Sequence, residues 1–184
     1  MIYLTDYISE ADLEKKILGS KLRCFGDENV DKKAIEVLLV WHFLVNEDSL
    51  KDFPNVKAIV RYGVGFDNID LNYCKNKNIK VFNNPDYGVD EVSDTALAMI
   101  MNFSRCLGFY NNKSRSLVVE PNQDNPWQEN ININALRLKN KTLGLIGAGR
   151  IASSLALKMK NIIGDIHFYD PYVDAGYEKV LGAF

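Results

Sequence analysis

The sequence predicts an α/β fold built on a doubly wound parallel sheet, in a chain of 184 residues that is long enough for two compact domains. Strand-like and helix-like segments alternate through the first half, which is typical of parallel strands joined by crossover helices. The segment Glu36–Phe43 is apolar on both faces, as expected of a strand that is buried on both sides. A further strand–helix–strand unit spans Lys141–Tyr169.

Periodicity and capping residues give the elements of the first half. The expected strands are Met1–Leu4, Lys21–Phe25, Glu36–Phe43, Val56–Tyr62 and Ile79–Asn83. The expected helices are one capped by Ser9 with Leu13, Ile17 and Leu18 on one face, one capped by Asp31, one containing Leu50 and Phe53 and ending at Pro54, and Asp70–Asn78.

A long helix follows, from about Asp90 or Ser93 to Tyr110. Its apolar residues surround most of the helix, which predicts burial between layers or between subunits; they are Ala96, Leu97, Met99, Ile100, Phe103 and Leu107. The next segment, Asn111–Asn134, is polar and irregular, and we expect Trp127 to anchor it on another surface.

Composition excludes several classes of protein. A net charge of −2, without a basic block, gives no electrostatic reason to expect a nucleic acid or an anionic membrane as partner. The apolar run Val37–Val45 is too short to span a bilayer, and the N-terminus has no signal-peptide pattern. Cys24, Cys74 and Cys106 lack metal-site spacing and are interpreted as small buried thiols of a cytoplasmic protein, so no metal site is expected.

A glycine-rich turn is the motif with the clearest chemistry. Strand Lys141–Ile146 leads directly into Gly147-Ala148-Gly149-Arg150-Ile151-Ala152, which opens the expected helix Arg150–Ile162. Gly147 allows the tight turn, and Gly149 lets a pyrophosphate approach the backbone. The helix N-terminus then offers N–H groups and a partial positive charge to the phosphates. This pattern predicts a dinucleotide site rather than a glycine turn without a ligand.

The next strand, Asp165–Tyr169, ends at Asp170, where the ribose-binding acid of such sites belongs. A carboxylate accepts hydrogen bonds from the ribose hydroxyls of NAD but repels the 2′-phosphate of NADP, so NAD is the expected cofactor. The expected cofactor-binding residues are Gly147, Gly149, Arg150, Ile151, Asp170 and Pro171. Arg150 could pair with the pyrophosphate or be a solvated residue, and Pro171 with Tyr172 could lie beside the adenine or form a plain turn.

A second motif follows the fourth expected strand, with the sequence Arg61-Tyr-Gly-Val-Gly-Phe-Asp-Asn-Ile-Asp70. Two glycines at the carboxyl end of a strand expose backbone N–H groups, and such a nest suits a carboxylate. Ligands of open α/β sheets bind at this edge. By itself the segment fits either a ligand site or a plain turn.

The segment Val60–Asp70 resembles the substrate-loop signature of the D-isomer-specific 2-hydroxyacid dehydrogenases, a family that includes phosphoglycerate dehydrogenase and the C-terminal-binding-protein corepressors. Val81–Pro85 and Asp90–Thr95 resemble the strand and hinge-helix segments of the family. The dinucleotide turn and Phe168-Tyr-Asp-Pro171 follow in the same order, closest to the corepressor-like branch.

The resemblance implies a flavodoxin-like substrate domain at residues 1–90 and the first part of a Rossmann NAD-binding domain at 91–184. Backbone N–H groups of Val64 and Gly65, with Arg61 nearby, would then bind the carboxylate of a small 2-hydroxy or 2-oxo acid. The segment at about 94–135 would form a homodimer. Tyr62, Phe66 and Tyr87 could line the substrate pocket or pack in the core.

The family transfers hydride with an Arg, a Glu and a His that follow the second strand of its nucleotide domain, and we expect no catalytic residue in this chain. His42 lies in a segment interpreted as a buried strand, and His167 lies within a strand, so neither matches the acid–base. We therefore expect a truncated NAD-binding domain whose Leu143, Leu145 and Ile146 lack cover, and weak NAD binding at best.

Three interpretations stay open: a dehydrogenase represented by part of its chain, a non-catalytic NAD-binding or interaction protein, and a lone flavodoxin-like domain. The dinucleotide turn and Asp170 argue against the third.

Overall fold

The computed structural model describes residues 1–8, 11–116 and 134–181. The chain divides into two compact units, unit 1 at Met1–Tyr87 and unit 2 at Gly88–Phe184, whereas the sequence placed the boundary after residue 90.

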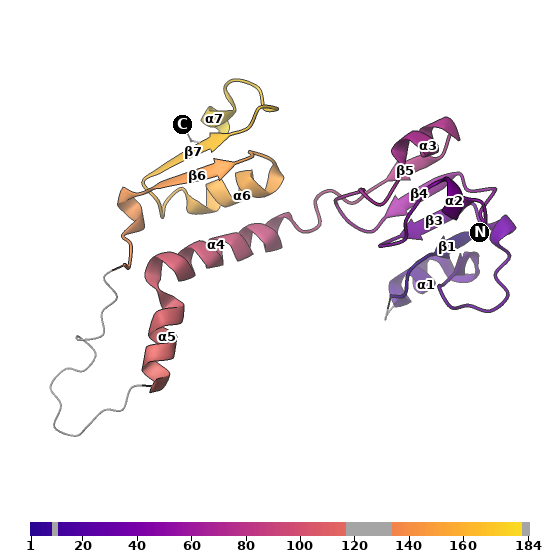
Figure 1. Ribbon diagram of the computed structural model, residues 1–184, viewed down its shortest axis with the longest axis horizontal. Helices are drawn as coiled ribbons and strands as arrows, with labels where there is room; N and C mark the ends of the chain where they lie inside the picture. Colours follow the sequence, from indigo (N-terminus) through magenta and orange to yellow (C-terminus); the bar gives the residue numbers. More distant parts are fainter. Residues whose placement is uncertain (9–10, 117–133, 182–184) are drawn as a thin grey trace. The chain divides into compact units, whose positions relative to one another are not determined.

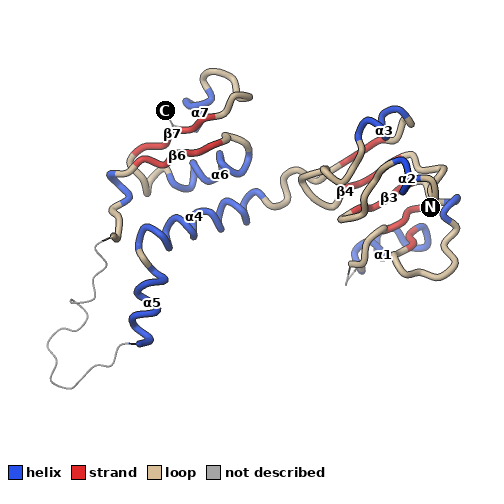
Figure 2. Tube along the Cα trace, viewed as in Figure 1, coloured by secondary structure: helices blue, strands red, loops and turns tan. Residues whose placement is uncertain are grey.

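Unit 1 alternates strands and helices as the sequence predicts (Figures 1 and 2). Its elements are β1 (Ile2–Leu4), α1 (Asp12–Leu18), η1 (Gly19–Lys21), β2 (Leu22–Arg23), η2 (Lys32–Ala34), β3 (Val37–Val40), α2 (Glu47–Leu50), β4 (Ala58–Arg61), α3 (Leu71–Asn76) and β5 (Lys80–Phe82). One of the two expected caps is present, because Asp31 accepts a hydrogen bond from the Lys33 N–H. Asp70, which the sequence placed inside a helix, is the N-cap of α3 and accepts a hydrogen bond from the Tyr73 N–H. Ser9, the other expected cap, lies outside the described residues.

The sheet of unit 1 is parallel, in the order β2-β1-β3-β4-β5, which is the flavodoxin-like arrangement. Both of its faces are buried: Leu38 and Ile59 belong to one core cluster, while their neighbours Leu39 and Val60 pack in another. The alternation follows from strand geometry, in which successive side chains point to opposite faces. The prediction of a parallel sheet that is apolar on both faces is therefore confirmed.

Two details of unit 1 differ from the sequence prediction. The strand expected at Glu36–Phe43 ends at Val40, because the N–H groups of Trp41 and His42 donate to the Asp6 carboxylate instead of to a neighbouring strand. His42 is consequently exposed rather than buried in a strand.

On α1, Leu13 and Ile17 are 65% and 70% exposed, so of the face predicted for this helix only Leu18 packs against the core. The helix has only seven residues, and none of them is fully buried.

Unit 2 contains α4 (Val89–Arg105), α5 (Leu107–Ser116), η4 (Leu138–Asn140), β6 (Thr142–Ile146), α6 (Arg150–Met159), β7 (Asp165–Tyr169) and α7 (Tyr177–Leu181). In the described part of unit 2, β6 and β7 form a parallel two-stranded sheet, with α6 packed on one face and α4 packed along α6 (Figure 1). Leu143 and Leu145 are half-buried against the core of this layer, whereas Ile146 on the other face is 96% exposed. The expected loss of cover therefore holds for Ile146 and is wrong for the two leucines.

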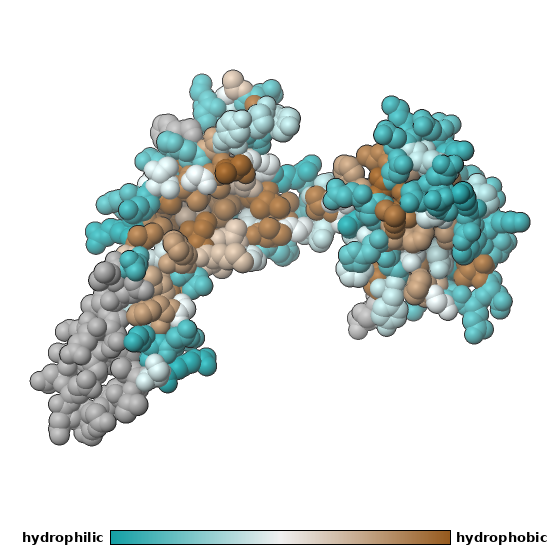
Figure 3. All heavy atoms as spheres, viewed as in Figure 1, coloured by the Kyte–Doolittle hydropathy of each residue, from teal (hydrophilic) through white to brown (hydrophobic). Residues whose placement is uncertain are grey.

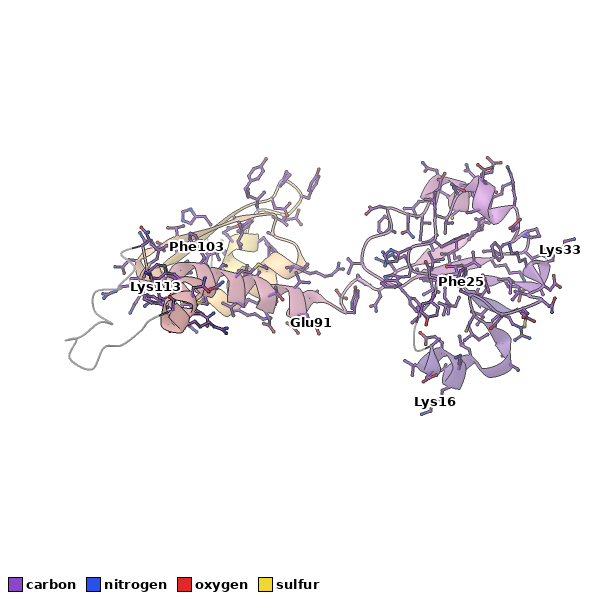
Figure 4. The ribbon with its side chains drawn as sticks, turned by 60° about the horizontal axis from the view of Figure 1, so that its bottom comes forward. Lys16, Phe25, Lys33, Glu91, Phe103 and Lys113 are labelled. Carbon is purple, nitrogen blue, oxygen red and sulfur yellow. The ribbon has the colours of Figure 1, made fainter. Side chains whose placement is uncertain are left out.

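The long helix predicted up to Tyr110 is in fact two helices. Cys106 adopts the left-handed conformation, with φ of 54°, which ends α4 and starts α5 in a new direction. One side of α4 packs on α6, but Met99 and Phe103 are 66% and 78% exposed, so the helix is not buried around its circumference (Figures 3 and 4). Residues 111–116 are helical rather than irregular, and Trp127 lies outside the described residues.

The cysteines are all free: Cys74 is buried as predicted, while Cys24 and Cys106 are partly exposed. Among the helices of the described segments, none has the length and apolar character that crossing a membrane requires.

Candidate functional site: a dinucleotide turn and a sheet-edge cleft

The glycine turn of unit 2 has the geometry that a dinucleotide requires. Gly147 lies at φ of +91°, a conformation that L side chains rarely adopt, and its N–H donates to the Tyr169 carbonyl across the two strands (2.7 Å). Gly149 is the N-cap of α6, and a Cβ built on it would meet no atom within 4 Å. That open space is where a phosphate could approach the backbone.

The first turn of α6 carries no acidic residue, so the partial positive charge of the helix N-terminus is not neutralised there. Helix geometry leaves the first N–H groups, including those of Ile151 and Ala152, without a partner inside the helix. Ile151 is 41% exposed beside this end. The turn can therefore hold an anionic group.

Asp170 is linked directly to the turn. Its Oδ2 accepts a hydrogen bond from the Ala148 N–H at 2.8 Å, and its Oδ1 accepts one from the Tyr172 N–H at 2.9 Å. Both hydrogen bonds lower the pKa of the Asp170 carboxyl from its usual value, and the bond from the Ala148 N–H has the larger effect. Since each carboxylate oxygen can accept a second hydrogen bond, the group remains able to bind a pair of hydroxyls.

Contacts between α4 and α6 fix the helix that carries the turn. Ser93 Oγ and Ser154 Oγ lie 3.0 Å apart, and Lys158 Nζ lies 2.6 Å from an Asp94 carboxylate oxygen and 3.2 Å from one of Asp90. The hydrogen bond to Asp94, followed by that to Asp90, raises the pKa of Lys158 despite some desolvation. These contacts, in the middle and last turn of α6, fix the helix against α4.

Unit 1 contains a cleft of about 610 Å³ at the carboxyl ends of β3 and β4. Its lining residues are Ile8, Trp41, Val60, Arg61, Tyr62, Gly63, Asn84 and Tyr87. Of these, Arg61 alone carries a full charge, and its Nε is buried without a hydrogen-bond partner in the described part of the chain. The conformation beside it favours glycine, because φ at Gly63 is +155°, and a Cβ there would lie 1.8 Å from Arg61 Nη1 and displace that guanidinium.

The loop after β4 is held by the residues after β5. Asn84 donates its N–H to the Gly63 carbonyl (3.1 Å), and Asn83 Nδ2 donates to the Val64 carbonyl (2.8 Å). In a trans peptide the N–H points opposite to the carbonyl, and no described peptide bond is cis. The N–H groups of Val64 and Gly65 therefore both point away from β5.

Asp6 anchors the other side of the cleft, at the point where the strand order reverses between β1 and β3. Its carboxylate accepts hydrogen bonds from the N–H groups of Trp41 and His42, at 2.8 and 2.9 Å, and from the Thr5 hydroxyl at 2.7 Å. Burial acts to raise the pKa of Asp6, but these hydrogen bonds outweigh it and the pKa is lowered. Asp6 thus fixes the backbone that presents Trp41 to the cleft.

Of the residues predicted to bind the substrate, some line the cleft and others do not. Arg61, Tyr62 and Tyr87 line the cleft, whereas Val64, Gly65 and Phe66 lie outside its lining. The other signature residues are structural: Asn68 Nδ2 donates to the Trp41 and Phe43 carbonyls, and Asp70 caps α3.

Sequence reasoning missed Asp6 and Trp41. Each follows a buried strand at the sheet edge where ligands of open α/β sheets bind, and that position was the available signal. Neither His42 nor His167 lines the cleft. Within the described ranges, no cluster of three or more His, Cys, Asp or Glu side chains could hold a metal ion.

The flavodoxin-like sheet and the glycine turn between β6 and α6 define an α/β protein of the doubly wound class. The model of the family described as D-isomer specific 2-hydroxyacid dehydrogenase, catalytic domain, matches residues 7–169, and the chain belongs to this family. The resemblance drawn from the loop and turn motifs is therefore confirmed.

Individual relatives agree with this assignment. The chain is 28% identical to C-terminal-binding protein 1 of Caenorhabditis elegans over 84% of its own length and 21% of that protein. It is 30% identical to glyoxylate/hydroxypyruvate reductase A HPR2 of Arabidopsis thaliana over 65% of its length and 36% of that protein. The structure of a D-lactate dehydrogenase from Aquifex aeolicus, complexed with NAD and lactic acid, matches with a TM-score of 0.79 and 26% identity.

That match covers all of this chain and 55% of the dehydrogenase, so the chain spans about half the length of the solved relative and less of the two others. A D-mandelate dehydrogenase of Rhodotorula graminis, 22% identical with a TM-score of 0.75, has the same fold over 99% of this chain and 59% of its own.

Proposed function

We propose that this chain provides the substrate-binding domain and the first part of the NAD-binding domain of a dehydrogenase that transfers hydride between NAD and a 2-hydroxy acid. The observation that carries the proposal is the hydrogen bond between Asp170 and the Ala148 N–H, which joins the ribose-binding acid to the phosphate-binding turn. NAD, when bound, would accept or supply the hydride.

The residues present fit this cofactor. The turn at Gly147 and Gly149 would hold the pyrophosphate against the N-terminus of α6, with Arg150 and Ile151 beside it. The Asp170 carboxylate would accept hydrogen bonds from the ribose hydroxyls of NAD. Its negative charge would repel the 2′-phosphate of NADP. Pro171 and Tyr172, of which Tyr172 is 95% exposed, would flank the adenine ring.

The substrate carboxylate would bind in unit 1. The N–H groups of Val64 and Gly65 point to the side of the loop that β5 does not occupy, and Arg61 supplies the positive charge. This chain's part would be to bind and orient the acid. We assign no acid–base residue to it.

A titration of NADH fluorescence on the 184-residue chain tests the cofactor site, with Gly149→Val as the key variant. A side chain at Gly149 would occupy the space of the phosphate, and we expect at least a ~10-fold loss of affinity, equivalent to about 1.4 kcal/mol. Gly144→Val is the matched control, because Gly144 also has open space around its Cβ position but lies within β6. Unchanged affinity in Gly149→Val, or no binding by the parent chain, would contradict the proposal.

The second candidate is a non-catalytic NAD-binding or interaction protein, favoured by the match of 84% of the chain to C-terminal-binding protein 1. NADH binding without turnover of any 2-oxo acid by the complete protein would favour it over the dehydrogenase. Either protein could be a homodimer through α4 and α5, where Met99, Phe103 and Leu107 are exposed and Met99, Phe103 and Leu136 line an apolar groove of about 440 Å³.

A further inference from the structure

The cleft in unit 1 is lined mainly by apolar and aromatic side chains. Five of its described lining residues present apolar or aromatic surface: Ile8, Trp41, Val60, Tyr62 and Tyr87. Trp41 and Tyr87 are 42% and 64% exposed, which leaves two large aromatic faces open to a ligand. Pockets of this size and character accommodate ligands with substantial apolar surface, and a two- or three-carbon acid would leave most of the cleft empty.

The charge in the cleft lies at one place. Arg61 is the one fully charged residue among its described lining residues, and its buried Nε lacks a hydrogen-bond acceptor in the described chain. The guanidinium already donates from Nη1 to the Tyr62 carbonyl, so Nε is the donor left without a partner. A buried donor without a partner costs free energy, and an anionic ligand that accepts hydrogen bonds from the guanidinium would reduce this cost. The cleft is therefore complementary to an anion at its Arg61 end and to apolar groups elsewhere.

Trp41 is held in place before any ligand binds. Its N–H donates to Asp6 Oδ2 at 2.8 Å, its carbonyl accepts from Asn68 Nδ2 at 3.3 Å, and its ring lies 4.2 Å from the His42 ring, centroid to centroid. An aromatic wall that is already ordered loses little conformational entropy when a ligand packs on it. Trp41 is thus preorganised as a contact surface.

Tyr62 adds carbon surface rather than charge. Its hydroxyl donates to Glu14 Oε1 at 2.9 Å, and burial, together with this hydrogen bond and the charge of Glu14, raises its pKa, so the phenol stays neutral. With its polar atom engaged by α1, the ring is left to contact the ligand.

From this arrangement we propose that the cleft selects a 2-oxo or 2-hydroxy acid with a large aromatic side chain, which packs on Trp41 and Tyr87 while the carboxylate end lies toward Arg61. This inference rests on the proposed function for the carboxylate site and adds the class of side chain. Burial of a phenyl group against such a wall is expected to tighten binding at least ~10-fold relative to a methyl group.

Trp41 itself can report the binding. The chain has two tryptophans, so a Trp127→Phe background leaves Trp41 as the single emitter. Titrating this variant with D-3-phenyllactate and with D-lactate should change its fluorescence, with a dissociation constant at least ~10-fold lower for phenyllactate. Equal affinities would overturn the inference while leaving the proposed carboxylate site intact. Absence of binding by both acids would overturn the substrate site, and the inference with it.

Calorimetry on Trp41→Ala tests the wall directly. We expect the preference for phenyllactate to fall to within ~3-fold while the affinity for lactate changes little. Leu44→Ala is the control, because Leu44 lies in the same loop, is 59% exposed and does not line the cleft. Tyr87→Ala provides a second wall variant should Trp41→Ala fail to fold. A preference that survives in the wall variants would refute the assignment.

Discussion

The two units use the same strand–helix alternation but bury their sheets differently. In unit 1, residues on both faces of β3 and β4 pack into separate core clusters. In unit 2, the face of β6 and β7 toward α6 is packed, and Ile146 and Tyr169 on the opposite face are 96% and 69% exposed. A strand's contribution to stability therefore depends on how many layers cover it, which the alternation alone does not reveal.

The largest expected effect compares one isoleucine from each sheet. Ile59→Ala removes a side chain that is fully buried in the centre of unit 1, and we expect a loss of about 3 kcal/mol in the free energy of unfolding. Ile146→Ala removes an exposed side chain of unit 2, with an expected change within about 0.5 kcal/mol. Urea titrations followed by circular dichroism measure both. Similar losses in the two variants would mean that the open face of β6 is covered in solution.

The second test compares two glycines of the loop after β4. Gly63→Ala places a Cβ at a strained φ and against the Arg61 guanidinium, so we expect about 1–2 kcal/mol of destabilisation and displacement of Arg61. Gly65→Ala lacks both problems, since the nearest atom would be 3.6 Å away at Asp67, and a change within about 0.5 kcal/mol is expected. Thermal unfolding distinguishes them, and equal stability of the two variants would show that the loop relaxes freely.

The third test measures how the contribution of Asp6, which lies where the strand order of unit 1 reverses, changes with pH. The pKa of Asp6 is lowered in the folded chain, so its contribution is fully present above the ordinary value of 3.8 and is lost as pH falls through the folded pKa. We expect Asp6→Asn to cost about 1 kcal/mol at pH 7 and less near pH 3. Urea titrations of parent and variant at both pH values measure the difference in their free energies of unfolding, which should shrink on acidification. A difference that grows on acidification would contradict the assignment.

The smallest effect on stability is expected at the exposed face of α4. Phe103→Glu should change the free energy of unfolding by no more than about 0.5 kcal/mol, because the ring is 78% exposed, but it should dissociate a homodimer. Glu91→Gln on the same helix is the control (Figure 4). Sedimentation velocity measures the outcome, and a monomeric parent chain or a dimeric Phe103→Glu would rule out this interface.

The sequence predicted correctly those features that depend on a few neighbouring residues. The glycine turn, the cap at Asp31 and the strand Asp165–Tyr169 were found from neighbouring residues, because turns, caps and strand periods depend on short-range geometry. The break at Cys106 was missed, since a residue other than glycine in the left-handed region gives no sequence signal of its own. The early end of β3 was missed because it depends on Asp6, far away in the chain.

Spacing, glycine placement and apolar periodicity were enough to identify the α/β class, the flavodoxin-like and dinucleotide-binding patterns, and the family. Strand packing in three dimensions brought Trp41, Arg61 and Tyr87 to one cleft, with Asp6 fixing the backbone of Trp41, and left Val64 and Gly65 outside the lining. Parallel strands bring their carboxyl ends together at one edge of the sheet, so residues distant in the chain become neighbours through the strand order.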